Sequence, residues 1–217
     1  MKKKKGLICF DLDNPLIHRT KAHIIAFQKS LRKHEHNNIT NKQLSDKFGV
    51  SSRIYLKELI PGITAKEINS IRKLHGRYLK ETSKKYAHKI RGVTNALKEL
   101  KKDYKIAIVT NCTKNDVDIF MKNLDMDFSL FDKIITNTRN LRPKPAPDEI
   151  IKAEKLLKLK ADYMIGDTVY DIMAAKKAGI KCIAVASGLQ SKSKLKKARP
   201  YAVLKSVKDL PGFLKKS

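Results

Sequence analysis

The chain has 217 residues, of which 41% are hydrophobic, a size and composition that suit one domain or a core domain with a modest insertion. No stretch approaches the roughly 18 apolar residues of a membrane-spanning helix, and residues 6–10, the apolar run after the N-terminal lysines, are too short for a secretion signal. The formal net charge of +27 is compatible with nucleic-acid binding or with a solvated basic surface that suits anionic substrates.

The composition favours the second of these interpretations. The lysines are scattered along the chain, aromatic residues make up only 6% of it, and there is no Trp. Single-stranded nucleic acids are commonly bound by stacking on aromatic side chains, so nucleic-acid binding is kept only as an alternative. Cys9, Cys112 and Cys182 lie far apart, without the spacing of a metal site or a disulfide framework. We therefore expect reduced thiols and a cytoplasmic protein.

Short apolar segments with turn signals recur along the chain. They are typical of strands in a parallel sheet that is covered on both faces, and they comprise residues 7–10, 106–110, 134–136, 163–165 and 182–186. Helical patterns lie between them, at residues 95–102, 113–124, 147–157 and 171–178, and residues 201–217 indicate a last strand and a closing helix. This alternation predicts an α/β fold with a doubly wound, Rossmann-like parallel sheet.

One segment interrupts the alternation. No strand pattern is visible between residues 16 and 88, and apolar residues recur there at helical spacing, as in residues 24–31 and 68–78. We interpret residues 16–88 as a helical insertion after the first strand, and residues 1–15 and 89–217 as the α/β core. Three histidines of the insertion, His18, His23 and His75, read as surface or interface residues rather than metal ligands.

Polar side chains stand where the predicted strands end. They are Asp11 and Asp13 after the first strand, Thr110 and Asn111 at the end of the second, Lys144 after the third, and Asp167 and Asp171 after the fourth. The carboxyl ends of parallel strands meet at one edge of the sheet, so we expect these groups to converge. Clustered carboxylates repel one another, and a divalent cation with oxygen ligands, above all Mg²⁺, would offset that repulsion. Taken singly, each residue could instead be a solvated turn or a helix cap.

Four segments also resemble the motifs of a known family. "DLDNPL", "IVTN", "RPKPAPD" and "GDTVYD" are similar, in order and spacing, to the four motifs of the haloacid dehalogenase (HAD) superfamily in its phosphatase branch. The resemblance extends over almost the whole chain, is closest to phosphoglycolate phosphatase-like members, and makes the helical insertion a mobile cap of subclass I. It implies a Mg²⁺-dependent phosphatase that hydrolyses small phosphomonoesters through an aspartyl-phosphate.

The resemblance assigns roles to the residues at the strand ends. Asp11 would be the nucleophile and Asp13 the general acid and base, while Lys144 would neutralise the nucleophile and a phosphoryl oxygen. Thr110, through its hydroxyl, and Asn111, through its backbone N–H, would bind the phosphate.

The same resemblance supplies the metal ligands. Asp11, the backbone carbonyl of Asp13, and Asp167 would hold the Mg²⁺, and Asp171 would be a further ligand or would support one. In the cap, Arg53 is a candidate substrate contact, with Lys47 and Lys57 as weaker ones. The substrate would be a small phosphorylated metabolite, with no role for a membrane and with a monomer or a homodimer as the assembly.

Pro15 departs from the family pattern, which usually has threonine there. Proline removes a hydroxyl and a backbone donor and disfavours the helical region for Asn14. We expect a working phosphatase, and whether Pro15 slows it is left open by the sequence. Two alternatives stay open. One is a sugar phosphomutase, because phosphomutases of the superfamily share the motifs and the cap. The other is a basic nucleic-acid-binding protein on a weakened phosphatase site.

Overall fold

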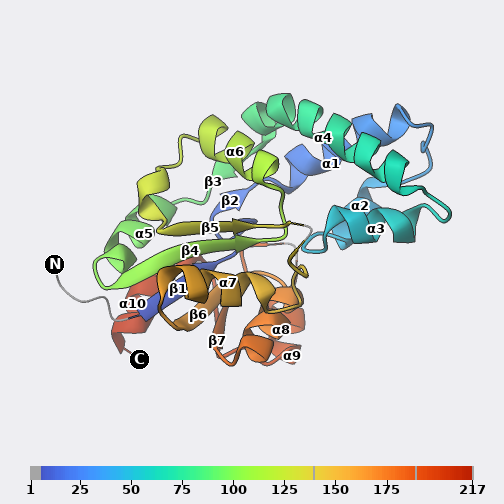
Figure 1. Cartoon of the computed structure of the whole chain (residues 1–217). Helices are drawn as coiled ribbons and strands as arrows, with labels where there is room; N and C mark the ends of the chain where they lie inside the picture. Colours follow the sequence, from blue (N-terminus) through green and yellow to red (C-terminus); the bar gives the residue numbers. More distant parts are fainter. Residues whose placement is uncertain (1–5, 139, 189, 217) are drawn as a thin grey trace.

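A computed structural model describes residues 6–138, 140–188 and 190–216. Within them, one sheet has the strand order β5-β4-β1-β6-β7-β8, and every neighbouring pair is parallel. The strands are β1 (Gly6–Phe10), β4 (Tyr104–Thr110), β5 (Lys133–Thr136), β6 (Ala161–Gly166), β7 (Lys181–Val185) and β8 (Ala202–Leu204). The chain runs outward from β1 on one side and then returns to β6 on the other, so the strand order reverses at β1 (Figure 1).

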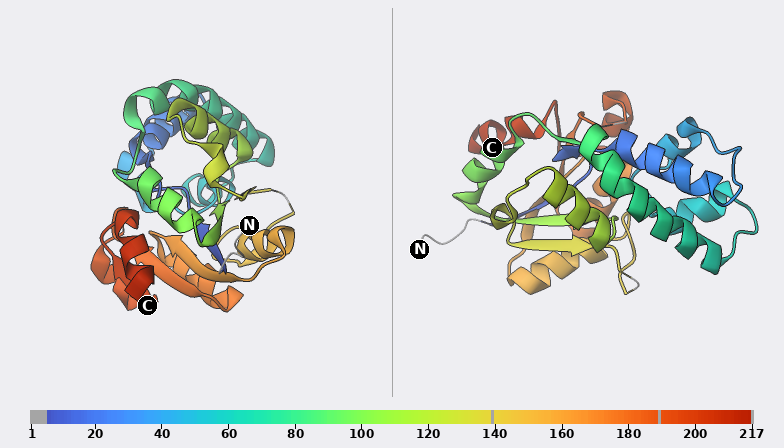
Figure 2. Two further views of the ribbon diagram at one scale, coloured as in Figure 1. Left: turned by 90° about the vertical axis from the view of Figure 1, so that its left-hand side faces the viewer. Right: turned by 90° about the horizontal axis from the view of Figure 1, so that it is seen from above.

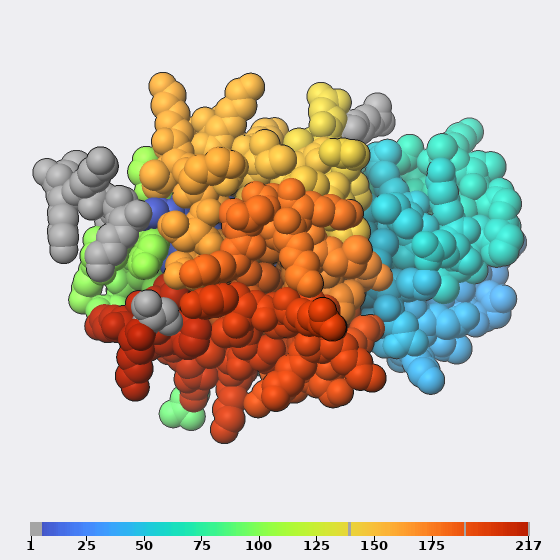
Figure 3. Space-filling model, turned by 90° about the horizontal axis from the view of Figure 1, so that it is seen from below, coloured from blue at the N-terminus to red at the C-terminus, as the bar shows by residue number. Residues whose placement is uncertain are grey.

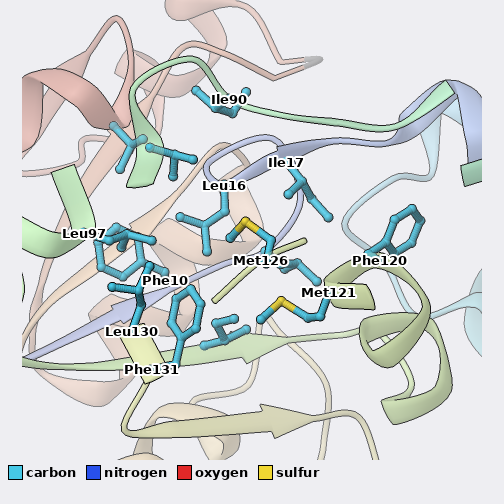
Figure 4. Packing of buried hydrophobic residues seen from close by; sticks show 14 of the residues in the cluster. Phe10, Leu16, Ile17, Ile90, Leu97, Phe120, Met121, Met126, Leu130 and Phe131 are labelled. Carbon is cyan, nitrogen blue, oxygen red and sulfur yellow. The ribbon is translucent and has the colours of Figure 1, made fainter. Parts of the chain in front are cut away.

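Helices cover both faces of this sheet. The helices that alternate with the strands are α5 (Val93–Lys101), α6 (Lys114–Asn123), α7 (Asp148–Leu157), α8 (Val169–Ala178), α9 (Lys192–Lys197) and α10 (Leu210–Lys216), with short 3₁₀ helices η1 (Phe128–Leu130) and η2 (Val207–Asp209). Alternate residues of β1 point to opposite faces. Ile8 and Phe10 pack against α5, α6 and α10, whereas Leu7 and Cys9 pack against α7 and α8. Figure 4 shows Phe10 among the buried residues of the first of these clusters. The doubly wound α/β prediction is therefore confirmed.

The segment after β1 forms a helical lobe at one end of the sheet (Figures 1 and 2). Its cap helices are α1 (Thr20–Arg32), α2 (Asn41–Asp46), α3 (Ser52–Leu59) and α4 (Ala65–Tyr86). Phe27, Leu31, Leu56 and Ile71 belong to a buried cluster that is separate from the two clusters of the sheet. The cap helices thus bury an apolar core of their own, and the domain division at residues 16 and 88 stays a prediction.

Two short strands escaped the sequence analysis. β2 (Ile17–His18) and β3 (His88–Lys89) pair in antiparallel fashion where the chain enters and leaves the cap helices. Strands of two residues are too short to show an alternating pattern, so the prediction of no strand between residues 16 and 88 was wrong at both of its ends. The pair ties the base of the lobe together beside the sheet.

The space-filling view shows the cap helices, in blue-green, directly against the core segments in orange (Figure 3). In the described part of the chain, no helix has the length and apolar character that crossing a bilayer requires.

The cysteines form no disulfide. Cys9 and Cys182 are buried in the sheet, and all three cysteines are unpaired.

Candidate functional site

The residues at the strand ends converge at the carboxyl edge of the sheet. β1 lies between β4 and β6, and the backbone N–H of Asp11 extends the pairing by donating to Ile165 O at 2.8 Å. Asp11, Thr110 and Asp167, which follow or end these three adjacent strands, are all buried. The point where the strand order reverses is the usual place for a ligand in such a sheet, and here it carries a group of buried carboxylates.

Lys144 lies at the centre of these carboxylates. Its Nζ donates to Asp11 Oδ1 and to Asp171 Oδ1, both at 2.7 Å, and to the carbonyl oxygen of Val109 at 3.1 Å. Only 4% of Lys144 is exposed. Burial alone would lower the pKa of this lysine, but the charges of Asp11 and Asp171 outweigh burial and raise it. Lys144 is therefore a fixed cation beside Asp11.

Asn111 holds the backbone of Lys144 in place. Asn111 Oδ1 accepts from Lys144 N at 2.8 Å, and Asn111 Nδ2 donates to Lys144 O at 3.1 Å. The same Nδ2 donates to Gly49 O at 2.7 Å, in the loop between α2 and α3. One core side chain thus positions the lysine and contacts the cap, a role that the sequence motif did not reveal.

Asp11, Asp167 and Asp171 form a cluster that fits a divalent cation. One carboxylate oxygen of each lies within 4.8 Å of the others, and all three residues are buried. Among the described residues, Asp167 Oδ1 has no hydrogen-bond partner, and a Cβ at Gly188 would collide with Asp167 Oδ2. Burial and then repulsion from Asp171 and Asp11 raise the pKa of Asp167. An orphaned buried oxygen in an all-oxygen cluster is what Mg²⁺ coordination satisfies.

Asp171 is also engaged by its own helix. Its Oδ2 accepts from the backbone N of Thr168 at 3.0 Å and from Thr168 Oγ1 at 2.6 Å, which completes a capping box at the start of α8. The other oxygen accepts from Lys144. These bonds favour a supporting role for Asp171 over direct coordination.

Pro15 lies in a tight turn whose backbone hydrogen bonds are donated by its neighbours, so the turn needs no N–H group at position 15. Asn14 N donates to Ile17 O at 2.8 Å, and the backbone N–H groups of Leu16 and Ile17 both donate to Leu12 O. Asn14 has a φ of 67°, in the left-handed region that asparagine tolerates. Its side chain donates to Asp167 Oδ2 at 3.0 Å. The turn thus brings a donor to the carboxylate cluster.

Asp13 is paired with an arginine that the sequence analysis overlooked. Arg19, just before α1, contacts the Asp13 carboxylate through Nε and Nη2, and its guanidinium also contacts Cys112 Sγ. The Arg19 side chain is 2% exposed and lies 4.6 Å from the centre of the Phe120 ring. No sequence motif marked Arg19, because its importance depends on where the turn after β1 places it.

His23 and His75 are buried behind Arg19, on the cap helices α1 and α4 where these face α6, so they are interface residues and not surface residues. Arg19 Nη1 contacts His23 Nε2, and His23 Nδ1 lies 2.9 Å from His75 Nε2. Burial first and then the Arg19 charge lower the pKa of His23, and burial lowers the pKa of His75 to about 4. Both rings are therefore neutral at physiological pH and leave the positive charge of Arg19 uncompensated on that side.

Two cavities meet at Asp13. The acidic cavity, of about 290 Å³, is lined by Asp11, Asp13 and Asp167, together with Asn14, residues of α2, the segment before α9, and Lys194 of α9. The basic cavity, of about 510 Å³, lies between the core and the cap helices. It is lined by Asp13, Arg19 and three residues of the buried apolar cluster of the cap, Phe27, Val50 and Tyr55. Its other charged lining residues are Arg72, Lys73, Arg77, Lys80 and Asp116.

The loop at Phe48 and Gly49 lines both cavities. Gly49 has a φ of 94°, and a Cβ there would lie 3.1 Å from Thr168 Cγ2, so glycine permits both the backbone conformation and the close approach to the core. The loop thus meets the core at Thr168 on one side and at Asn111 on the other.

The candidate cap contacts lie elsewhere. Arg53 is exposed and lines a third cavity with Arg72, Thr138 and other residues, and that cavity includes none of the clustered carboxylates. Lys47 pairs with Glu58 at 2.5 Å on the surface, and Lys57 is exposed. The structure therefore does not bring these three residues to Asp11.

Glu149 is a second residue that the sequence analysis overlooked. It lies in the first turn of α7, is fully buried, and has no hydrogen-bond partner for either carboxylate oxygen within the described residues. Burial raises its pKa to about 8, against the opposing effect of Lys144. Glu149 is thus a buried acid that interacts electrostatically with Lys144, Asp11 and Asp171.

Comparison with known proteins identifies the family. Residues 8–185 match the family described as haloacid dehalogenase-like hydrolases. The chain belongs to this family. The pyrophosphatase PpaX of Bacillus mycoides is 28% identical over 214 residues, which cover 97% of each chain, and the pyrophosphatase PpaX of Anoxybacillus flavithermus is 28% identical over 209 residues, or 95% of each chain.

Solved structures agree with this fold. A hydrolase of Pseudomonas syringae superposes with a TM-score of 0.85 at 24% identity, covering 98% of this chain and 99% of the other. A Haemophilus somnus protein described as a predicted phosphoglycolate phosphatase has a TM-score of 0.85 at 19% identity, covering 99% of each chain. The resemblance to HAD phosphatases is confirmed, and this HAD chain is an enzyme, a phosphatase.

Proposed function

We propose that this HAD phosphatase is Mg²⁺-dependent and hydrolyses small phosphorylated metabolites through an aspartyl-phosphate on Asp11. The observation that carries the proposal is the cluster of Asp11, Asp167 and Lys144 at the point where the strand order reverses. A buried carboxylate held 2.7 Å from a buried ammonium, next to an orphaned carboxylate oxygen, suits a nucleophile that must approach an anionic phosphoryl group.

The protein groups divide the work between two steps. A carboxylate oxygen of Asp11 attacks phosphorus, and the bond from phosphorus to the leaving oxygen breaks. Asp13, at the junction of the two cavities, gives a proton to the leaving oxygen and then takes one from the water that hydrolyses the acyl phosphate. Lys144, the Thr110 hydroxyl and the Asn111 N–H hold the phosphoryl oxygens.

Mg²⁺ would be held by Asp11, the backbone carbonyl of Asp13, and Asp167, with Asp171 supporting Lys144. When bound, the ion would neutralise the clustered carboxylates and the charge that develops on the phosphoryl oxygens. Asn14, which donates to Asp167 Oδ2, would orient that ligand.

Phosphate release from a chromogenic phosphate ester tests the proposal. We expect turnover with Mg²⁺, loss of turnover with EDTA, and a loss of about a thousandfold or more in Asp11→Asn. Acid quenching during turnover should trap one phosphoryl group on the peptide that contains Asp11, as read by mass spectrometry. Activity that persists in Asp11→Asn or in EDTA would contradict the mechanism.

The same assay separates the substrate classes. Relatives named pyrophosphatases, at 26–28% identity over at least 94% of this chain, favour adding pyrophosphate to the panel of phosphomonoesters. A phosphomutase would convert a sugar phosphate to its isomer with little release of phosphate. A nucleic-acid-binding protein on a weakened site would release none and would bind oligonucleotides in a salt-sensitive manner.

A further inference from the structure

The position of Arg19 between two cavities suggests a role that no motif assigns. Asp13 lines both cavities, whereas Asp11 and Asp167 line only the acidic one and Arg19 lines only the basic one. If the phosphoryl group lies against Asp11, as the proposed function requires, the leaving group extends past Asp13 into the basic cavity. Arg19, which contacts Asp13, is then a cation beside the path of the leaving group.

Arg19 is held in a fixed orientation from several sides. An arginine can only donate, so His23 Nε2 must accept from Arg19 Nη1, and His23 Nδ1 then carries the proton that it donates to His75 Nε2 at 2.9 Å. The Phe120 ring covers the guanidinium at 4.6 Å. This bracing spares the arginine most of the entropy that a flexible side chain loses on binding a ligand.

The known contacts of Arg19 do not use all of its hydrogen-bond donors. Arg19 Nε and Nη2 contact Asp13, Nη2 also contacts Cys112, and Nη1 contacts His23. Nη1 carries a second hydrogen, and no partner for it is found within residues 6–138, 140–188 and 190–216. Burying a cation is costly, and replacement by apolar residues is often neutral or stabilising. A buried arginine that lines a cavity therefore suits binding of an anion.

The rest of the basic cavity has the same sign of charge. Arg72, Lys73, Arg77 and Lys80, all on α4, line it, and apart from Asp13 its carboxylate is Asp116. A neutral leaving group such as a simple alcohol would make no use of these cations. An anionic leaving group would be attracted by all of them and paired directly by Arg19.

We propose, resting on the phosphatase function above, that Arg19 is a specificity residue that binds a second negatively charged group on the leaving group. The substrate class is then a phosphate compound whose leaving group is itself an anion, such as a carboxylate or a second phosphate. His23 and His75 are positioning residues for this arginine.

A matched pair of substrates tests the proposal: 2-phosphoglycolate, which carries a carboxylate, and 2-hydroxyethyl phosphate, its neutral counterpart. We expect the wild type to prefer the charged compound in kcat/KM. Arg19→Met should reduce that preference about ten- to hundredfold, the loss of one charge-assisted hydrogen bond, and Arg19→Lys should restore part of it. Arg32→Met is the matched control, because Arg32 is exposed on the same helix and outside both cavities.

The ratio of kcat/KM for the two substrates distinguishes two roles of Arg19: binding the leaving group, or only orienting Asp13. If Arg19→Met slows both substrates equally and leaves the preference unchanged, Arg19 only orients Asp13 and the proposal is overturned. Calorimetric binding of the same two compounds to Asp11→Asn and to Asp11→Asn/Arg19→Met gives a second measure of the preference. Absence of turnover in the wild type would count against the phosphatase function, and the binding ratio would still decide the role of Arg19.

Discussion

Glu149 shows how much a single buried acid can couple stability to pH. Its pKa of about 8 lies above the ordinary value of 4.5 chiefly because of burial, with Asp11, Asp171 and Asp148 adding to the rise and Lys144 opposing it. The folded protein therefore holds a proton on Glu149 at pH values where the unfolded chain has lost it. The stability that this proton supports is complete below about pH 4.5 and is lost as the pH rises through about 8.

Replacement of Glu149 by glutamine should remove that loss. Glutamine has nearly the shape of the protonated acid and no charge. We expect Glu149→Gln to unfold with the same free energy as the wild type near pH 4.5 and to exceed it increasingly up to pH 8, by about 2–4 kcal/mol. Urea unfolding across this range, without magnesium, measures the difference, and Glu81→Gln on exposed α4 surface controls for net charge. Parallel curves for Glu149→Gln and wild type would contradict the shifted pKa.

Sequence and structure agree best for residues that belong to short motifs. Asp11, Lys144 and Asp167 each follow a predicted strand, and parallel strands bring such positions together whatever the details of packing. Arg19 and Glu149 could not be found in this way. Their burial depends on how the turn after β1 and the first turn of α7 lie against the core, which no local pattern encodes.

At the scale of elements, the prediction of helices succeeded because caps and stripes are local. Thr113 accepts from Asp116 N at the start of α6, and Gly179 ends α8 in the left-handed conformation, both as their residue types predict. The strands of the sheet were found by their apolar runs but lengthened in the structure, for example to Tyr104–Thr110. Pairing with neighbours extends a strand past the apolar residues that reveal it.

Ile71 offers a test of whether the cap helices open on their own. It is fully buried in the cap cluster, and Ser30 Oγ donates to its carbonyl oxygen at 2.6 Å, which joins α1 to α4. We expect Ile71→Ala to cost about 2–5 kcal/mol in the local stability of the cap helices and to leave β4 and β6 protected, as measured by hydrogen exchange. Ile150→Ala, in α7, should instead lower protection in the sheet.

A uniform loss of protection in Ile71→Ala would show a single cooperative unit. It would also contradict the division of the chain into a core and a cap at residues 16 and 88, which the separate apolar clusters favour but do not test.

At the scale of the whole molecule, the net charge of +27 acts over a longer range than any single contact. A positive surface attracts anionic substrates and raises their rate of encounter, and salt screens this attraction, since the Debye length falls from roughly 14 Å at 0.05 M to about 3 Å at 1 M. The cations that line the basic cavity would concentrate this attraction near Asp13.

We therefore expect kcat/KM for a dianionic phosphate substrate to fall as NaCl rises from about 0.05 to 0.5 M, while kcat changes little, because salt weakens encounter more than the chemistry in a buried site. Steady-state kinetics at fixed free Mg²⁺ measure both constants. A short oligonucleotide added at low salt distinguishes the alternative: strong competitive inhibition would indicate that the basic surface binds nucleic acid. A kcat/KM that is independent of salt, with no such inhibition, would mean that the lysines only solvate the surface.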